Sequence, residues 1–425
     1  MSEQRKRLMN IVGGSAGNLV EWFDWYVYAA FALYFKSAFF PDGDPTAQLL
    51  QTAAVFAVGF VMRPIGAWVM GRYADTKGRK AGLTLSVTLM CLGSLAIACA
   101  PTYAQVGALS PLILLVARMV QGFSLGGEYG SSATYLSEMA GRERRGFWSS
   151  FQYVTLIAGQ LLALALLLAL QASMGEAALE AWGWRIAFGG GAVLAIVVFI
   201  IRRRLTETPS FEKVSAAPER KASSLFALFR EHPREAWLVM ALTVGGTLAF
   251  YAYTTYMQKF LANTVGFDRE TASRIMTVAL FVFMALQPVA GALSDRVGRK
   301  PVMIAFGVAG TLLTVPIFTA LETARDPLTA FALVMAALVM VTGYTSINAV
   351  VKAELFPGHI RALGVAMPYA LANTLFGGTA EYVALWLKDA GHERWFYWYV
   401  AAGIGLSLIA YVTMRETRDA SLIED

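Results

Sequence analysis

Five ionisable side chains of the first half lie inside stretches that are otherwise apolar: Glu21, Asp24, Arg63, Arg118 and Glu128. A charged side chain at the centre of a bilayer costs about 3 kcal/mol by insertion scales, so it normally faces a cavity or a partner. The set holds three acids and two bases, which leaves one carboxylate without a basic partner. Because burial disfavours the charged form of a carboxyl group, such a residue can carry a proton.

Helical spacing places these groups on common faces. Asn18, Glu21 and Asp24 are spaced by three in GNLVEWFDWY, and residues three apart share a helix face. Arg118 and Glu128 lie on roughly one face of the later segment RMVQGFSLGGE. The functional interpretation is proton coupling by these groups. The alternative is that all of them form structural pairs at helix contacts.

Small residues four apart accompany both segments. Gly13 with Gly17 and Gly122 with Gly126 are pairs of the kind that lets two helices approach closely in a membrane. We therefore expect these two segments to meet and to bring an acid of the first segment to Arg118.

The apolar stretches of the second half carry mainly neutral polar groups, among them Tyr251 and Asn373, with Lys352 near the end of one stretch. Such side chains can hydrogen-bond a ligand, whereas the alternative for tyrosines is a belt at the membrane interface. In the first half, Gln152 and Gln160 are eight residues apart and nearly aligned on a helix. For this pair, a ligand contact and an interhelical hydrogen bond are equally open.

A charged phrase, GRYADTKGRK at 71–80, returns as GALSDRVGRK at 291–300. Glycines permit tight turns, and an aspartate at a helix end can pair with an arginine or with a helix N-terminus across an interface. We expect the two copies, with a repeated Glu–Arg pair, to form a latch, the alternative being solvated loops that only fix topology. The expected latch residues are Gly71, Asp75, Gly78, Arg79, Lys80, Glu138, Arg145, Gly291, Asp295, Gly298, Arg299, Lys300, Glu354 and Arg361.

The elements that must position these groups are membrane-spanning helices. The chain is 57% hydrophobic, its mean hydropathy is +0.53, and stretches of about 20 apolar residues, the length that crosses a bilayer, recur along it. The pattern predicts an all-α membrane protein with twelve transmembrane helices in two pseudo-symmetric six-helix bundles. The expected spans are 11–38, 47–71, 81–100, 111–139, 147–171, 184–203, 235–262, 270–293, 301–321, 328–352, 362–388 and 394–414.

The predicted domains are a first bundle at 1–204, a polar cytoplasmic linker at 205–234 and a second bundle at 235–425. An even number of spans puts both termini on one side. Most lysines and arginines fall on that side, so the positive-inside rule places both termini in the cytoplasm.

The remaining composition argues against other classes of protein. The net charge is +6, but the basic residues sit in short loops rather than in a patch with interleaved aromatics, which argues against nucleic-acid binding. The three histidines fall in loops or at their edges, without a metal-ligand or nucleophile pattern. We expect no enzyme activity, no metal and no cofactor, with the proton as the coupling ion and sodium as the alternative.

Several longer stretches carry a family resemblance: GNLVEWFDWYVY, VMRPIGAWVMGRYADTKGRK, RMVQGFSLGGEYGSSATYLSE and VKAELFPGHIRALGV. They are similar to segments of the metabolite:proton symporter family of the major facilitator superfamily, and the resemblance covers nearly the whole chain. It implies import of a small carboxylate with protons across a bacterial inner membrane. It also implies that Arg118, with Gln121 and Gly122, matches the superfamily's fourth-helix arginine motif, which is linked to proton coupling.

The expected mechanism joins the buried charges. Asp24 or Glu21 holds Arg118 by charge-assisted bonds until protonation releases the arginine. Arg118 and Arg63 then bind the two carboxylates of a dicarboxylate, because a guanidinium suits bidentate binding. The resemblance implies that this dicarboxylate is α-ketoglutarate. A citrate-like acid or a zwitterion such as proline or betaine is the alternative cargo, and a monomer is expected. Further substrate contacts are expected from Asn18, Gln152, Gln160, Tyr251, Asn373 and Lys352.

Overall fold

The computed structural model describes residues 3–77, 79–203, 225–357 and 360–423. The helices of the first half are α1 (Glu3–Phe39), α2 (Pro45–Lys77), α3 (Arg79–Ala98), α4 (Tyr103–Val106), α5 (Leu109–Gly126), α6 (Tyr129–Met139), η1 (Arg142–Arg144), α7 (Arg145–Ser149), α8 (Phe151–Ala178), η2 (Leu179–Gly183) and α9 (Trp184–Arg203).

The second half begins with a short helix, α11, within the predicted linker. Its helices are α11 (Leu225–Glu231), α12 (Pro233–Tyr251), η3 (Ala252–Tyr256), α13 (Met257–Phe260), η4 (Leu261–Val265), α14 (Arg269–Val297), α15 (Arg299–Glu322), α16 (Pro327–Thr345), α17 (Asn348–Glu354), α18 (Arg361–Ala372), η5 (Asn373–Gly377), α19 (Ala380–Asp389) and α20 (Arg394–Thr413).

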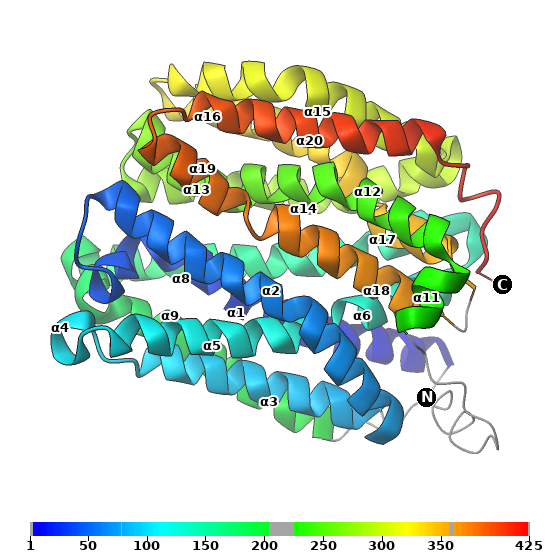
Figure 1. Ribbon diagram of the computed structural model, residues 1–425, viewed down its shortest axis with the longest axis horizontal. Helices are drawn as coiled ribbons and strands as arrows, with labels where there is room; N and C mark the ends of the chain where they lie inside the picture. Colours follow the sequence, from blue (N-terminus) through cyan, green and yellow to red (C-terminus); the bar gives the residue numbers. More distant parts are fainter. Residues whose placement is uncertain (1–2, 78, 204–224, 358–359, 424–425) are drawn as a thin grey trace.

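All twelve predicted spans fall on helices. Among the described residues, eight helical stretches are long and apolar enough to cross a membrane, and one of them, Arg142–Ile200, contains both α8 and α9. The other predicted spans correspond to α1, α3 and the α18–α19 pair. The helices run side by side along the long axis of the molecule, and the start of α1 and the C-terminal tail lie at the same end (Figure 1). We call this end the tail end.

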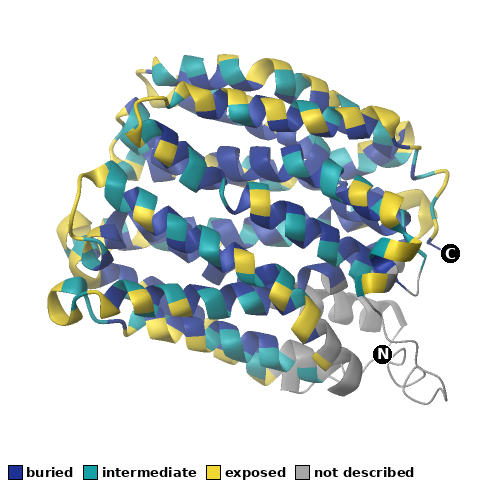
Figure 2. Ribbon diagram, viewed as in Figure 1, coloured by how far each residue is buried: buried dark blue, intermediate teal, exposed yellow. Residues whose placement is uncertain are grey.

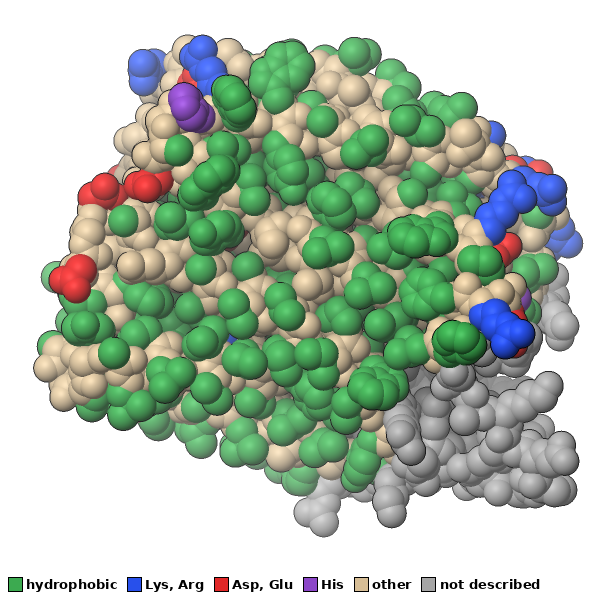
Figure 3. Space-filling view, viewed as in Figure 1, with side chains coloured by type: hydrophobic (Ala, Val, Ile, Leu, Met, Phe, Trp, Pro, Cys, Tyr) green, Lys and Arg blue, Asp and Glu red, His purple; other side chains and the backbone are tan. Residues whose placement is uncertain are grey.

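The outer surface suits lipid rather than water. Large apolar side chains such as Trp68, Leu92 and Leu312 are exposed on the outside of the bundle. Exposed residues recur along the outer faces of the helices (Figure 2). On the face shown in Figure 3, an apolar band covers the middle and the described charged side chains gather at the two ends. Such a band is what a bilayer requires of a spanning protein.

The two halves repeat the same helix pairings. α3 packs against α9 in the first half as α15 packs against α20 in the second, and α1 lies on α8 as α12 lies on α18. Across the interface, α2 contacts α18 and α19, whereas α14 contacts α7 and α8. The predicted pseudo-symmetric architecture is confirmed, while the domain limits at 1–204, 205–234 and 235–425 stay a prediction.

Helix irregularities occur where the two halves meet. Pro64 lies inside α2 and has no N–H to donate to the carbonyl four residues earlier. That carbonyl, of Phe60, instead accepts a 2.8 Å hydrogen bond from Thr374 of η5. The π-helical turns η3 and η5 interrupt the two spans that carry Tyr251 and Asn373. Short π-helical segments often mark functional sites.

Candidate functional site

Asp24 and Arg118 are joined through Gln121. Gln121 donates from its Nε2 to Asp24 Oδ2 over 2.6 Å, and its Oε1 accepts from Arg118 Nη1 over 2.7 Å. Ser94 of α3 also donates to the Asp24 carboxylate. All four side chains are fully buried. The expected direct bond between Asp24 and Arg118 is therefore replaced by a relay, because the Gln121 side chain occupies the space between them.

Two guanidinium groups lie against one tryptophan ring. Arg63 lies 4.3 Å and Arg118 lies 3.9 Å from the ring centroid of Trp25. Both arginines are buried, and their Nε and Nη2 atoms have no hydrogen-bond partner among the described residues. Aromatic faces compensate a guanidinium only partly. These free N–H groups can therefore bind an anion.

Close packing of α2 on α5 brings the two arginines together. A Cβ atom on Gly122 would lie 1.8 Å from the Gly59 carbonyl oxygen, and one on Gly126 would lie 2.0 Å from the Arg63 carbonyl oxygen. Only glycine fits at these positions. The first span and α5 meet at the Asp24–Gln121 contact, as expected. The α5 glycines do not mediate this contact, because their surface packs on α2.

The other predicted ionisable and amide groups of the first and fourth spans lie outside this relay. Glu21 is buried and accepts from Ser86 over 3.4 Å. Asn18 donates to Thr155 over 2.8 Å and accepts from Trp22 over 3.0 Å, so its amide links helices. Glu128 is buried at the junction between α5 and α6.

Tyr251 and Asn373 lie beside the arginine pair. Tyr251 packs edge-on against Phe60 at 5.3 Å between centroids and lies close enough to Arg63 and Asn373 to interact with both. Asn373 accepts from Thr247, while its Nδ2 atom has no partner among the described residues. The structure thus brings these two predicted contacts to the same place as Arg63.

The two glutamines of the predicted pair are both buried on α8. Gln160 lines a small pocket with Tyr26 of α1 and Thr254 of η3, between the two halves. Its Oε1 atom has no partner among the described residues. Gln160 therefore has the freer oxygen for a ligand, and the alignment of the two residues along one helix is as expected.

Lys352 lies on α17, in the second half. It is fully buried and donates to Asn348 Oδ1 over 2.9 Å and to the Tyr344 hydroxyl over 3.4 Å. Its Nζ lies 4.1 Å from the ring centroid of Tyr369. Lys352, which the sequence predicts as a substrate contact, is thus enclosed by aromatic rings.

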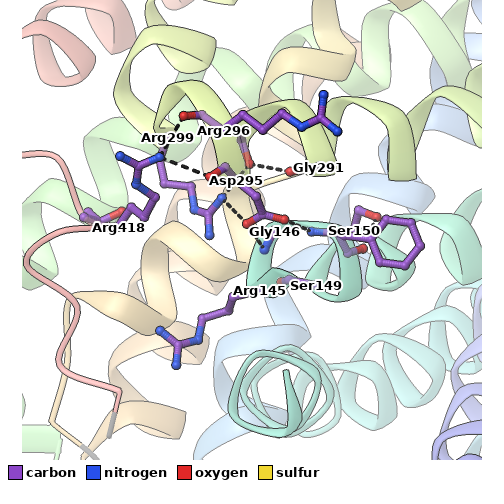
Figure 4. Close-up of polar contacts among 12 residues, drawn as sticks. Arg145, Gly146, Ser149, Ser150, Gly291, Asp295, Arg296, Arg299 and Arg418 are labelled. Atoms are coloured by element: carbon purple, nitrogen blue, oxygen red, sulfur yellow. Dashed lines mark hydrogen bonds and ion pairs between the residues drawn. The ribbon is translucent and has the colours of Figure 1, made fainter. Parts of the chain in front are cut away.

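A latch joins the halves at the tail end. The Asp295 carboxylate at the end of α14 accepts from the backbone N–H groups of Gly146 and Phe147 over 2.8 and 2.9 Å. Both donors lie in the first turn of α7, which belongs to the other half (Figure 4). Arg299 donates to the same carboxylate over 2.7 Å. An anion at a helix N-terminus is favourable, and the predicted interaction between an aspartate and a helix start takes this form.

The second copy of the charged phrase is supported by further contacts. Arg299 lies 3.7 Å from Glu354, and Gly298 adopts a positive φ of 101°, a conformation that side chains other than glycine rarely adopt. Gly291 packs so closely on Gly146 that a Cβ atom added to Gly291 would lie 2.6 Å from the carbonyl oxygen of Gly146. The first copy's Gly71, Asp75, Gly78, Arg79 and Lys80, and also Glu138, lie outside the described side chains.

The C-terminal tail covers the latch, which the sequence-based analysis missed. Glu416 accepts from the backbone N–H groups of Arg299 and Lys300, each over 2.9 Å. Arg361 donates to the Leu422 carbonyl over 2.6 Å. Arg145 donates to Ser421 over 3.2 Å. The short polar tail has no hydrophobic periodicity, so its sequence does not predict a structure for it. Its role becomes visible only in its contacts, such as those of Glu416 with the first N–H groups of α15.

A buried ion pair also escaped the sequence-based analysis. Lys259 of α13 lies 3.0 Å from Glu381 of α19 and donates to the Ala29 carbonyl of α1 over 3.0 Å. Lys259 is fully buried and Glu381 is 4% exposed. The signal available in the sequence was a lysine in the seventh predicted span and a glutamate in the eleventh. No group of histidine, cysteine and acidic side chains that could hold a metal ion occurs in the described part of the chain.

Comparisons with known proteins agree with this architecture. The profile of the family described as Sugar (and other) transporter matches residues 9–228 and 211–424. The chain is 56% identical over 399 residues to the alpha-ketoglutarate permease of Escherichia coli (strain K12), covering 94% of this chain and 91% of the relative.

More distant relatives carry other cargoes in their names. The citrate-proton symporter of Klebsiella pneumoniae is 32% identical over 413 residues, covering 96% of this chain and 92% of the relative. The proline/betaine transporter of Escherichia coli (strain K12) is 31% identical over 424 residues, covering 97% and 84%. The solved structure of the MFS (major facilitator superfamily) proton:xylose symporter XylE shares the fold, with a TM-score of 0.77 at 19% identity over 97% of both chains.

Proposed function

Because this chain belongs to the Sugar (and other) transporter family of the major facilitator superfamily, we propose that it imports the dicarboxylate α-ketoglutarate together with protons. The chain is a multi-pass membrane transporter and not an enzyme. The identity of 56% to a protein named alpha-ketoglutarate permease supports the cargo. The observation that carries the proposal is the pair of buried arginines with free N–H groups, Arg63 and Arg118, beside a buried carboxylate.

The relay through Gln121 supports a coupling between proton and anion. While Asp24 is ionised, it accepts from the Gln121 amide, and the amide oxygen accepts from Arg118. A proton on Asp24 removes the charge that orients the amide, so Arg118 becomes free to turn to an anion. The bound anion in turn offsets the buried guanidinium charge. Proton and dicarboxylate therefore move together, because each lowers the cost of binding the other.

The latch supports alternating access. The bonds from Gly146 and Phe147 to Asp295 must break when the tail end opens, because donor and acceptor belong to different halves. The two halves would rock about the central site so that the tail end and the opposite end open alternately, as in other transporters with repeated halves. We propose that the tail end faces the cytoplasm of a bacterium, with the chain in the inner membrane as a monomer.

The proposed cargo competes with two alternatives, a citrate-like acid and a zwitterion such as proline or betaine. A zwitterion presents one carboxylate and its own positive charge. Two neighbouring guanidinium groups with free donors suit a doubly negative cargo better than a zwitterion.

The test uses the purified chain in proteoliposomes with an imposed inward proton gradient. Labelled α-ketoglutarate should accumulate, unlabelled glutarate should compete with it, and betaine should not. Accumulation should collapse when a proton ionophore is added. Competition by betaine without competition by glutarate, or accumulation that resists the ionophore, would overturn the proposal.

A further inference from the structure

Lys352 is a buried lysine without a carboxylate partner among the described residues. None of the acidic side chains described forms an ion pair with it, and its hydrogen bonds go to the neutral groups of Asn348 and Tyr344. The other buried lysine of the second half, Lys259, is paired with Glu381. Burying a charge without a counter-charge is costly, so the contrast between the two lysines indicates that Lys352 has a ligand to compensate it.

Aromatic rings from both halves enclose this lysine. Tyr369 of α18 lies 4.1 Å from the ammonium, while the rings of Tyr344 and Tyr129 lie 5.6 and 5.9 Å away. Tyr129 comes from α6 in the first half, stacks on Tyr369 at 3.9 Å between centroids and donates to Asn348 over 3.1 Å. Lys352 therefore lies at the interface between the halves, where a cargo must pass.

Tyr369 connects the lysine to the arginine pair. It lies near enough to Arg63 and Tyr251 to interact electrostatically with both. The helix α18 that carries Tyr369 packs against the helix α2 that carries Arg63. Arg63 and Lys352 thus lie near the same buried ring, and both are basic side chains without a carboxylate partner among the described residues.

We propose that Lys352 binds the second carboxylate of the cargo while Arg63 and Arg118 hold the first, so that Lys352 sets the preference for dicarboxylates over monocarboxylates. This inference rests on the proposed function. It assigns the arginines to one carboxylate, whereas the sequence alone led us to expect that they would share the two. The bond from Tyr129 to Asn348 breaks when the tail end opens, which uncovers Lys352 and gives the cargo its exit.

The experiment measures equilibrium binding of glutarate and of pentanoate, a dianion and a monoanion of equal chain length, to the purified full chain. Lys352→Met should weaken glutarate binding by about tenfold or more and change pentanoate binding less than about twofold. Lys352→Arg should restore most of the glutarate affinity. Asn348→Asp places a carboxylate beside the lysine at the present 2.9 Å contact, so it should weaken glutarate binding selectively even if Lys352→Met fails to fold.

A second measurement separates ligand binding from a structural role. Without ligand, Lys352→Met should keep or raise the thermal stability, because it removes an uncompensated buried charge. The control variant Lys259→Met should lower the stability and leave the glutarate-to-pentanoate ratio unchanged. Equal losses for both ligands in Lys352→Met and Asn348→Asp, or no loss, would overturn the inference alone. A wild-type chain without preference for glutarate would overturn the proposed function as well.

Discussion

Arg118 and Asp24 communicate through a single amide, that of Gln121, which accepts from the guanidinium over 2.7 Å and donates to the carboxylate over 2.6 Å. This arrangement differs from an ion pair, because the charge on Asp24 acts on Arg118 by orienting the amide. A change in the protonation state of the carboxylate therefore reaches the arginine through the position of the amide.

The relay can be tested at its middle. Gln121→Leu removes both hydrogen bonds, so the protonation state of Asp24 no longer controls Arg118. We expect accumulation driven by a pH gradient to fall by about tenfold, while exchange of internal for external α-ketoglutarate falls much less. Gln171→Leu, which removes a hydrogen bond to Tyr34 far from the relay, should leave both rates unchanged. Equal losses of accumulation and exchange in Gln121→Leu would contradict the relay.

The arginine pair predicts a sharp difference between arginine and lysine. Arg63→Lys keeps the charge but loses the planar fork that lies over Phe60 at 3.9 Å. We expect the KM for α-ketoglutarate uptake to rise by about tenfold, which corresponds to roughly 1.4 kcal/mol.

The matched control for Arg63→Lys is Arg185→Lys. Arg185 lies over Trp184 at 4.2 Å and donates to backbone carbonyls, so it resembles Arg63 in its stacking but lies outside the site. Its KM should stay within about twofold of the wild-type value. A KM that is unchanged in Arg63→Lys would remove Arg63 from the binding site.

The latch predicts how readily the tail end opens. Asp295→Asn replaces an acceptor of three N–H groups by a neutral amide that also brings donors of its own. We expect a loss of about 1–3 kcal/mol for the latched state. Alkylation of a cysteine placed at buried Ser150 should then become at least about fivefold faster, in a background without Cys91 and Cys99. Asp419→Asn, at an exposed tail residue, should leave the rate as it is, and an equal rate in Asp295→Asn would show that the latch has no effect.

The Lys259–Glu381 pair predicts a stability effect that is independent of transport. Lys259→Met leaves the buried Glu381 without its 3.0 Å partner, which typically costs about 3–5 kcal/mol. The double variant Lys259→Met, Glu381→Leu should recover most of this loss. Thermal unfolding of the purified protein measures both effects. A double variant as unstable as Lys259→Met would mean that the cation has other essential contacts.

The sequence predicts the spans well, because long apolar stretches have only one stable form in lipid. It also predicts Asp24, Arg63 and Arg118 as buried charges, since their placement in such stretches is visible from composition alone. It does not predict which helix faces meet. Gly122 and Gly126 permit a close approach to any partner, and the choice of α2 depends on the packing of the whole bundle.

Contacts made by side chains from distant segments are beyond the sequence for a similar reason. Gln121 shares a helix turn with Arg118, but its role depends on Asp24 and Ser94 from two other helices. Lys259 meets Glu381 only because α13 and α19 lie side by side at the end opposite the tail (Figure 1).

Asp268, an acid outside the membrane, provides the control for a substitution of Asp24. Asp268 caps α14 and accepts from Thr271, and these hydrogen bonds hold the pKa of its carboxyl below its usual value of 3.8. Because the pKa of Asp268 is lower in the folded protein, the ionised carboxylate stabilises the folded state at pH values above the usual pKa of 3.8. This stabilisation is lost as the pH falls through the lower pKa of the folded state. Asp268 therefore stays ionised between about pH 5 and pH 8, so Asp268→Asn should not alter the response of uptake to pH in that range.

The most direct test of the account compares accumulation and exchange of labelled α-ketoglutarate in proteoliposomes that contain Asp24→Asn. An asparagine mimics the protonated carboxyl and takes up no proton. We predict that the variant still exchanges internal for external α-ketoglutarate but no longer accumulates it against a concentration gradient when the outside is acidified. Uphill accumulation that persists and still increases with external acid would contradict the account, because Asp24 would then not carry the proton.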